Sequence, residues 1–182
     1  GWEVDSKEIR FASGVRPVRG RNMAIAEWPT TSGPADYALF IGTVCVGVVE
    51  AKRQRKNVSA AIDQAERYSK GFHFKDGADP ASGPWDEYKI PFLFATNGRP
   101  YLKQIETESG IWFRDARKPT NLRRALTGWH TPEGLKAMLD MDEEKAAAAL
   151  KAQPFDFGFP LRPYQQRAIE RVEEELSHGK RQ

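Results

Sequence analysis

The segment 33–52, GPADYALFIGTVCVGVVEAK, decides the fold of this chain. It contains two apolar runs rich in β-branched residues, Tyr37–Ile41 and Thr43–Ala51, which meet near Gly42. Two such runs around a glycine are typical of a β-hairpin, and their continuous hydrophobicity indicates strands that are buried on both faces. The sequence therefore predicts a hairpin in the protein interior.

Charged residues stand at the open end of this hairpin. Asp36 lies at the entrance of the first strand, and Glu50 and Lys52 lie at the exit of the second. Because side chains alternate along a strand, Glu50 and Lys52 share one face. A two-residue turn would place Asp36 and Glu50 on opposite faces. A shared face therefore requires an odd-length loop or a β-bulge, for which Gly42 and Gly47 are the candidates.

Two carboxylates and a lysine in this position suit metal-assisted hydrolysis of a phosphodiester. Mg²⁺ prefers oxygen ligands and combines one or two carboxylates with phosphate oxygens and water. The metal lowers the pKa of a bound water, and a lysine orients that water, helps to deprotonate it or stabilises developing negative charge. Asp36, Glu50 and Lys52 are the catalytic candidates. The simpler alternative is a loop-capping aspartate and a surface ion pair.

The pattern Glu-x-Lys by itself carries little information, because it occurs at 50–52, 87–89 and 143–145. Only the first example has an acidic residue across a predicted hairpin and a basic segment directly after it. That segment is RQRK at 53–56, and a helix is expected to follow it, capped by Asn57 or Ser59 and ending near Lys70 before Gly71. Gln64 and Tyr68 are one turn apart and share a face of this helix. Ordinary packing of the helix on a sheet is the alternative explanation for them.

The remaining elements alternate between strands and helices. Further strands are expected at Met23–Trp28, Ile90–Ala95, Tyr101–Ile105 and Gly110–Arg114, and helices from Thr131 and over Pro163–Gly179. This order predicts an α/β fold in which a mixed central β-sheet is flanked by helices. We expect one domain over residues 1–150, then a linker with three phenylalanines and one helix over residues 151–182.

Composition and charge limit the functional classes. With 182 residues, 40% of them hydrophobic, the chain can bury a core without staples, and its single cysteine, Cys45, excludes a disulfide framework. The most apolar stretch, Tyr37–Val49, is too short to cross a bilayer, and no signal peptide is recognised, so we expect a cytoplasmic protein with no membrane partner. Basic residues cluster in Arg10–Arg21, Ala51–Lys70 and Arg114–Arg124, which suggests a surface facing a polyanion. Solvated surface is the alternative reading of each patch.

These motifs resemble those of a known nuclease superfamily. Pro34-Ala35-Asp36, Glu50-Ala51-Lys52 and Gln64-Ala65-Glu66-Arg67-Tyr68 are similar to the PD-(D/E)xK core with the Gln-x-x-x-Tyr motif of its RecB-like branch. The segments 33–40 and 48–53 resemble more closely the N-terminal nuclease domain of the endonuclease and motor subunit of type I restriction-modification enzymes. The resemblance implies cleavage of double-stranded DNA with Mg²⁺, for which Mn²⁺ substitutes. It also implies methyltransferase and specificity subunits as partners.

The resemblance assigns roles residue by residue. Asp36 and Glu50 would be metal ligands, the Ala51 carbonyl a third, and Glu27 an additional acidic group, with Lys52 as the catalytic lysine. Residues expected to support the site or to contact DNA are Gln64, Tyr68, Arg53, Arg55 and Lys56.

The C-terminal segment resembles a second motif of the same subunit. Leu161-Arg162-Pro163-Tyr164-Gln165 is similar to the Q-motif that opens helicase-like motors, in which a glutamine recognises the adenine of ATP. Gln165 and Arg162 would therefore bind nucleotide in the full subunit. The chain contains no Gly-x-x-x-x-Gly-Lys-Ser/Thr phosphate loop, so we do not expect it to hydrolyse ATP.

Two alternatives to the function implied by the resemblance remain: a non-catalytic DNA clamp or docking module that keeps the nuclease fold, and a stand-alone RecB-like nuclease.

Overall fold

The computed structural model describes residues 1–141 and 161–177, and the chain divides into two compact units, Gly1–Leu139 and Asp140–Gln182. Each unit is described by itself. The predicted boundary at residue 150 and the predicted linker both lie outside the described residues.

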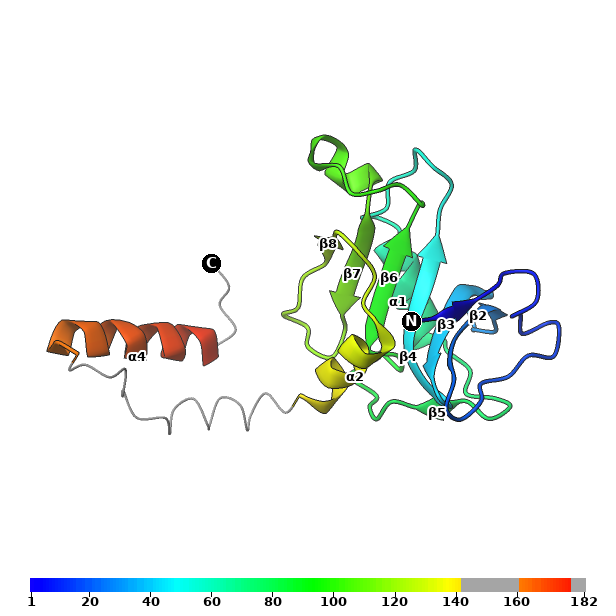
Figure 1. Ribbon diagram of the computed structural model, residues 1–182, viewed down its shortest axis with the longest axis horizontal. Helices are drawn as coiled ribbons and strands as arrows, with labels where there is room; N and C mark the ends of the chain where they lie inside the picture. Colours follow the sequence, from blue (N-terminus) through cyan, green and yellow to red (C-terminus); the bar gives the residue numbers. More distant parts are fainter. Residues whose placement is uncertain (142–160, 178–182) are drawn as a thin grey trace. The chain divides into compact units, whose positions relative to one another are not determined.

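The first unit is built on an eight-stranded mixed sheet (Figure 1). The strand order is β1-β2-β3-β4-β6-β7-β8, and β5 pairs with β4. Neighbours are antiparallel except for β1 with β2 and β4 with β5 and β6, which are parallel. The strands are β1 (Glu3–Val4), β2 (Asn22–Trp28), β3 (Ala35–Ile41), β4 (Val44–Ala51), β5 (Asp79–Pro80), β6 (Phe92–Thr96), β7 (Ile111–Asp115) and β8 (Arg124–Leu126). The predicted α/β fold with a mixed sheet is confirmed.

The predicted hairpin forms the centre of this sheet. Its strands β3 and β4 are joined by a tight turn at Gly42 (φ 61°), between the paired residues Ile41 and Val44. Both strands have neighbours on both sides, and helices pack on both faces of the sheet, so most of their residues are buried. The chain's single cysteine, Cys45, is fully buried in β4, and burial raises the pKa of its thiol.

One helix covers each face of the sheet. On one face, α1 (Ile62–Lys70) contributes Ala65 and Tyr68 to a core that includes the hairpin residue Val48. On the other face, α2 (Pro132–Asp140) contributes Leu135 to a core with Leu39. Period-two alternation thus sends neighbouring hairpin residues into two different cores.

The observed ends of α1 and α2 agree with the predicted capping residues to different degrees. The Thr131 hydroxyl accepts the Gly134 N–H at the start of α2, as expected of an N-cap. Asn57 caps the turn before α1 by accepting the Ala60 N–H, but α1 itself begins after Ala61 without a side-chain cap. Gly71 follows Lys70 as predicted. Its φ of −89° is not left-handed, and a side chain there would crowd Thr31.

The predicted strand at Tyr101–Ile105 is wrong. Lys103–Glu108 forms a short 3₁₀ helix, η1, and the backbone N–H and C=O of Leu102 both bond to the Ser109 hydroxyl. These polar groups are therefore satisfied locally, without a neighbouring strand.

Trp28, the last residue of β2, anchors the end of this strand in the core. It is fully buried, contacts the rings of Phe11, Phe40 and Phe72, and donates its indole N–H to the His73 carbonyl. These contacts explain the residue as a core anchor and fix the end of β2 that precedes β3.

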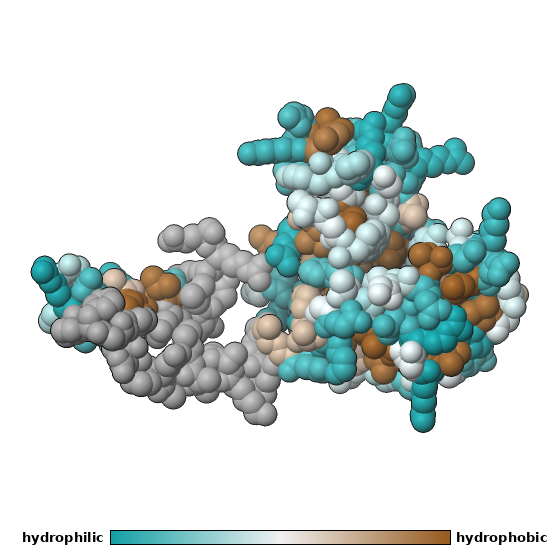
Figure 2. Space-filling view, viewed as in Figure 1, coloured by the Kyte–Doolittle hydropathy of each residue, from teal (hydrophilic) through white to brown (hydrophobic). Residues whose placement is uncertain are grey.

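The surface is mixed in character. Figure 2 shows hydrophobic patches among larger hydrophilic areas, and the exposed apolar side chains include Val4 and Trp129. These two residues border a cavity of about 260 Å³ on the sheet face that α2 covers in part. None of the helices described is both long enough and apolar enough to cross a bilayer.

The second unit contains α4 (Pro163–Ser177), close to the predicted helix. Its first helical residue is Pro163, which is favoured there because the first turn needs no N–H from it. The side-chain oxygen of Gln165 accepts the Arg162 N–H at 2.9 Å and so caps this helix.

Gly47 tests how tightly the centre is packed. A Cβ at this position would lie 3.1 Å from Leu39 and 3.2 Å from the Phe92 carbonyl, whereas Gly128 has open space around it. We therefore expect Gly47→Ala to lower the free energy of unfolding by about 1–2 kcal/mol. Gly128→Ala should leave it unchanged or slightly higher. Urea denaturation followed by tryptophan fluorescence measures both, and equal stabilities would contradict the close packing.

Candidate active site

A β-bulge brings the two candidate carboxylates to the same face of the sheet. Near the turn the strands pair as a two-residue hairpin, but the register shifts by one residue at Val46, which has no partner. Tyr37 then pairs with Val49, so that the next position outward sets Asp36 against Glu50. Directly opposed residues share a face. The bulge required by the sequence analysis is therefore present, next to Gly47.

The side chains at the end of the hairpin contact one another. Glu50 is buried, with 4% of its surface exposed, and its Oε1 forms an ion pair with the Lys52 ammonium. Asp36 Oδ2 accepts the backbone N–H of Ala51 at 2.6 Å. The other carboxylate oxygen of Glu50, Oε2, is buried without a hydrogen-bond partner. A buried carboxylate oxygen without a partner is costly, so the site is suited to accept a further polar or charged group.

Burial and charge act together on Asp36. Desolvation raises the pKa of its carboxyl, and the nearby Glu50 carboxylate raises it further. The Ala51 N–H and the Lys52 ammonium oppose this shift. The two carboxylates thus repel each other in a partly desolvated place, which is the environment that a bound cation stabilises.

Tyr68 from α1 completes this group. Burial raises the pKa of its hydroxyl, and the Glu50 carboxylate raises it further because it favours the protonated phenol. Gln64, one turn earlier, also interacts with the Tyr68 hydroxyl. The structure thus brings Asp36, Glu50, Tyr68 and Gln64 together from three elements.

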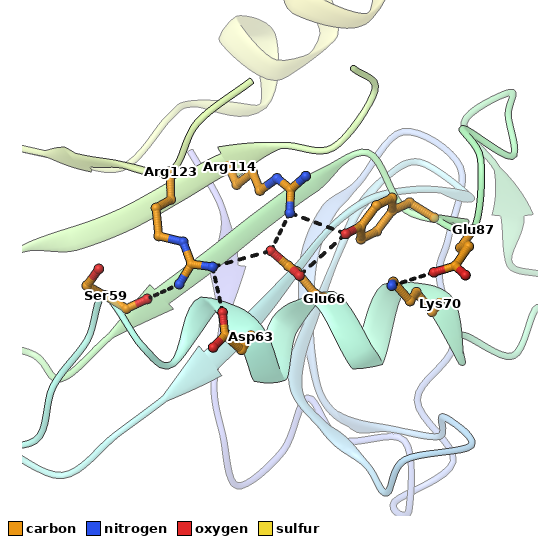
Figure 3. A network of polar contacts seen from close by, with 8 residues as sticks. Ser59, Asp63, Glu66, Lys70, Glu87, Arg114 and Arg123 are labelled. Carbon is orange, nitrogen blue, oxygen red and sulfur yellow. Dashed lines mark hydrogen bonds and ion pairs between the residues drawn. The ribbon is translucent and has the colours of Figure 1, made fainter. Parts of the chain in front are cut away.

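Ion pairs on the opposite side of α1 fix the orientation of this helix (Figure 3). Glu66 receives Arg114 of β7 and lies 3.8 Å from Arg123, and the Tyr88 hydroxyl also bonds to it. Arg123 in addition holds the start of the helix through the Ser59 carbonyl. The remaining pairs along the helix are Asp63 with Arg123 and Lys70 with Glu87. These contacts explain why Gln64 and Tyr68 face the hairpin.

Glu27 is not part of this group. The register of β2 and β3 would set it beside Asp36, but its left-handed backbone (φ 55°) interrupts the pairing, and its exposed carboxylate is ion paired with Arg10. Its role as a metal ligand remains a prediction without support from these contacts.

The basic residues Arg53, Arg55 and Lys56 follow β4 in an exposed connection. The Lys52 N–H bonds to the Thr96 carbonyl, and the Asn97 side chain bonds to the Lys56 carbonyl, so both ends of the connection are tied to the end of β6. The sequence analysis missed Asn97, Glu66 and Arg114, because the partners lie 41 and 48 residues apart and no local pattern links them.

The competing Glu-x-Lys at 87–89 has a structural explanation. Glu87 is paired with Lys70, and the Lys89 ammonium donates to the Phe72 carbonyl at 3.1 Å. The third example, at 143–145, lies outside the described residues. Context rather than the tripeptide thus distinguishes the candidate site.

The mixed sheet with its bulged hairpin and flanking helices is consistent with a restriction-endonuclease-like core. A family model described as the second domain of the type I restriction enzyme EcoKI endonuclease subunit matches residues 3–139. The chain is also 38% identical over 210 positions to the type I restriction enzyme EcoKI endonuclease subunit of Escherichia coli (strain K12). The chain belongs to this family of endonuclease-subunit second domains. The match covers 100% of the chain but 18% of that relative, and no solved structure matches.

Removing the central ion pair on α1 should loosen the helix. We expect Arg114→Ala to lower the free energy of unfolding by about 2 kcal/mol, because it leaves the mostly buried Glu66 carboxylate poorly compensated. Arg21→Ala, which breaks an exposed pair with Glu3, is the matched control and should change stability little. Urea denaturation decides between them, and equal effects would show that the Glu66 contacts do not fix α1.

Proposed function

We propose that this chain is the nuclease domain of a type I restriction endonuclease subunit and hydrolyses phosphodiester bonds in double-stranded DNA. The observation that carries the proposal is the Asp36–Glu50 pair, brought to one face by the bulge, with Lys52 beside it. Membership in the endonuclease-subunit family supports the same activity.

The residues present fit Mg²⁺ as the cofactor. Asp36 and Glu50 offer carboxylate oxygens, one of them buried without a partner, and the Ala51 carbonyl is the proposed third ligand. Across the described ranges, no group of three or more acidic, histidine or cysteine side chains is placed to hold a metal. Two carboxylates and one carbonyl are a donor set that suits Mg²⁺, which commonly keeps water and binds substrate phosphate alongside one or two carboxylates. When bound, the metal would lower the pKa of a water and offset charge on the phosphate.

The protein residues have separate tasks in this proposal. Asp36 and Glu50 would hold the cation, and the Tyr68 hydroxyl would orient Glu50. Lys52, which is ion paired with Glu50 in this structure, would orient and help to deprotonate the attacking water or stabilise the charge that develops on the phosphate. Gln64 braces the group from α1, and Arg53, Arg55 and Lys56 contact the DNA backbone.

The wider assembly follows from the resemblance. The full subunit would couple cleavage to ATP-driven translocation in the cytoplasm, with methyltransferase and specificity subunits as partners. Arg162 and Gln165 would bind the nucleotide there. In the structure, the side chain of Gln165 caps α4, a contact that it would exchange for the adenine.

A non-catalytic DNA clamp is the second candidate. It is favoured by the small number of metal-binding side chains and by the Glu50–Lys52 ion pair, which neutralises one of the two carboxylates. Metal affinity separates the two functions, because a clamp should lack affinity for Mn²⁺. Asp36→Ala should weaken Mn²⁺ binding in the nuclease and leave DNA affinity unchanged in the clamp.

Nicking of supercoiled plasmid in Mn²⁺ tests the proposed activity. Lys52→Ala should retain the fold and metal binding but lose at least about 100-fold in rate, as expected for loss of one transition-state contact. Lys89→Ala, from the second Glu-x-Lys, is the control and should nick as the wild type does. Activity retained in Lys52→Ala would reject this site. Absence of nicking in the wild type would leave a domain that needs its motor, or the clamp.

Substitution of Gln165 should not affect the activity of the nuclease site. We expect Gln165→Ala to leave nicking by this chain unchanged, because α4 belongs to the other compact unit. The same substitution in the full subunit should raise the KM for ATP. An unchanged KM there would show that capping of α4 is the sole role of this side chain.

A further inference from the structure

An open cavity of about 610 Å³ lies beside Lys52, between the connection that follows β4 and the helix α1. Its positively charged lining residues are Lys52, Arg53, Lys56 and Arg67, and none of the residues that line it carries a carboxylate. A concave surface with charge of one sign concentrates ions of the other sign. The cavity is therefore suited to an anionic group.

Most of this charge is not neutralised within the protein. Lys52 is paired with Glu50, but Arg53, Lys56 and Arg67 form no ion pair among residues 1–141 and 161–177. The contrast within α1 is clear. Its other charged residues are paired on the side shown in Figure 3, whereas Arg67 lines the cavity.

Arg67 is held in place by a neutral partner. Its Nε donates to Gln64 Oε1 at 3.1 Å, and a terminal nitrogen donates to the same oxygen. An amide oxygen restricts the guanidinium without cancelling its charge. Because a guanidinium carries five N–H donors, others remain for a ligand.

The opposite wall of the cavity is also fixed. Asn97, with 4% of its surface exposed, donates to the carbonyls of Lys56 and Glu108 at 3.1 and 2.8 Å. The Val58 N–H bonds to the Thr107 carbonyl at 2.7 Å. Arg55, directly before Lys56, has a left-handed backbone (φ 69°), a conformation that needs such support in a residue other than glycine. The wall is thus arranged without a ligand.

We propose that this cavity binds the DNA phosphate next to the one that is cut, and that Arg67 is a DNA-binding residue oriented by Gln64. The proposal rests on the proposed nuclease function, because Lys52 belongs to both the site and the cavity wall. Arg67 donates charge-assisted hydrogen bonds to the phosphate oxygens. Gln64 acts through Arg67 as a positioning residue.

The test measures binding of short duplex DNA to the 182-residue chain by fluorescence anisotropy, in EDTA and over a series of KCl concentrations. Arg67→Gln should reduce the slope of log K against log salt by about 0.9, which corresponds to about 8-fold weaker binding at 0.1 M salt. Arg67→Lys should keep the slope. Lys70→Gln removes one charge from the same helix outside the cavity and is the matched control, expected to leave the slope unchanged.

A double-mutant comparison tests the role of Gln64. Gln64→Ala should weaken binding, and Gln64→Ala combined with Arg67→Gln should bind no more weakly than Arg67→Gln alone. Equal slopes for Arg67→Gln and Lys70→Gln, additive losses in the double variant, or a wild type that does not bind duplex DNA would each overturn the proposal.

The binding assay contains no metal and involves no cleavage, so the two proposals fail separately. If Arg67→Gln lowers the slope but the wild type does not nick plasmid, the phosphate site stands and the nuclease function of the isolated chain does not. If the wild type nicks plasmid but the salt slopes of Arg67→Gln and Lys70→Gln are equal, the nuclease function is supported and the phosphate site is rejected.

Discussion

One unpaired residue in β4 determines whether this molecule has a site at all. Without the bulge at Val46, the two-residue turn at Gly42 would set Asp36 opposite Val49 and leave Glu50 on the other face. With it, two carboxylates meet at the end of a buried hairpin. The fold tolerates the electrostatic repulsion between these carboxylates because the rest of the hairpin is held on both sides by neighbouring strands.

The polar and charged residues on the two sides of α1 have different roles. One side carries ion pairs with β7 and the segments around Tyr88 and Arg123, which hold the helix. The other side presents Tyr68, Gln64 and Arg67 to the hairpin and the basic cavity. Ion pairs within the protein thus hold one side of the helix, whereas Arg67 on the other side is bonded to the neutral Gln64 and keeps a positive charge that no carboxylate of the described residues neutralises.

The sequence was sufficient for features set by local pattern. Two apolar runs around Gly42 predicted the central hairpin, and the face on which Glu50 lies led to the requirement for a bulge. It was insufficient where distant residues decide the structure. The Arg114–Glu66 pair spans 48 residues, and Tyr101–Ile105 resembles a strand but bonds locally to Ser109. Glu27 was expected to be an additional acidic group near the metal, but its backbone is left-handed and its carboxylate is ion paired with Arg10.

The position of Cys45 gives this hairpin a built-in reporter. The residue lies immediately before the bulge, its thiol is fully buried with a raised pKa, and the chain has no other cysteine. A thiol reagent can modify it only when β4 separates from its neighbours, because the thiolate must both form and reach solvent. The rate of alkylation in the native protein therefore measures how often the strand register on which the carboxylate pair depends is transiently lost.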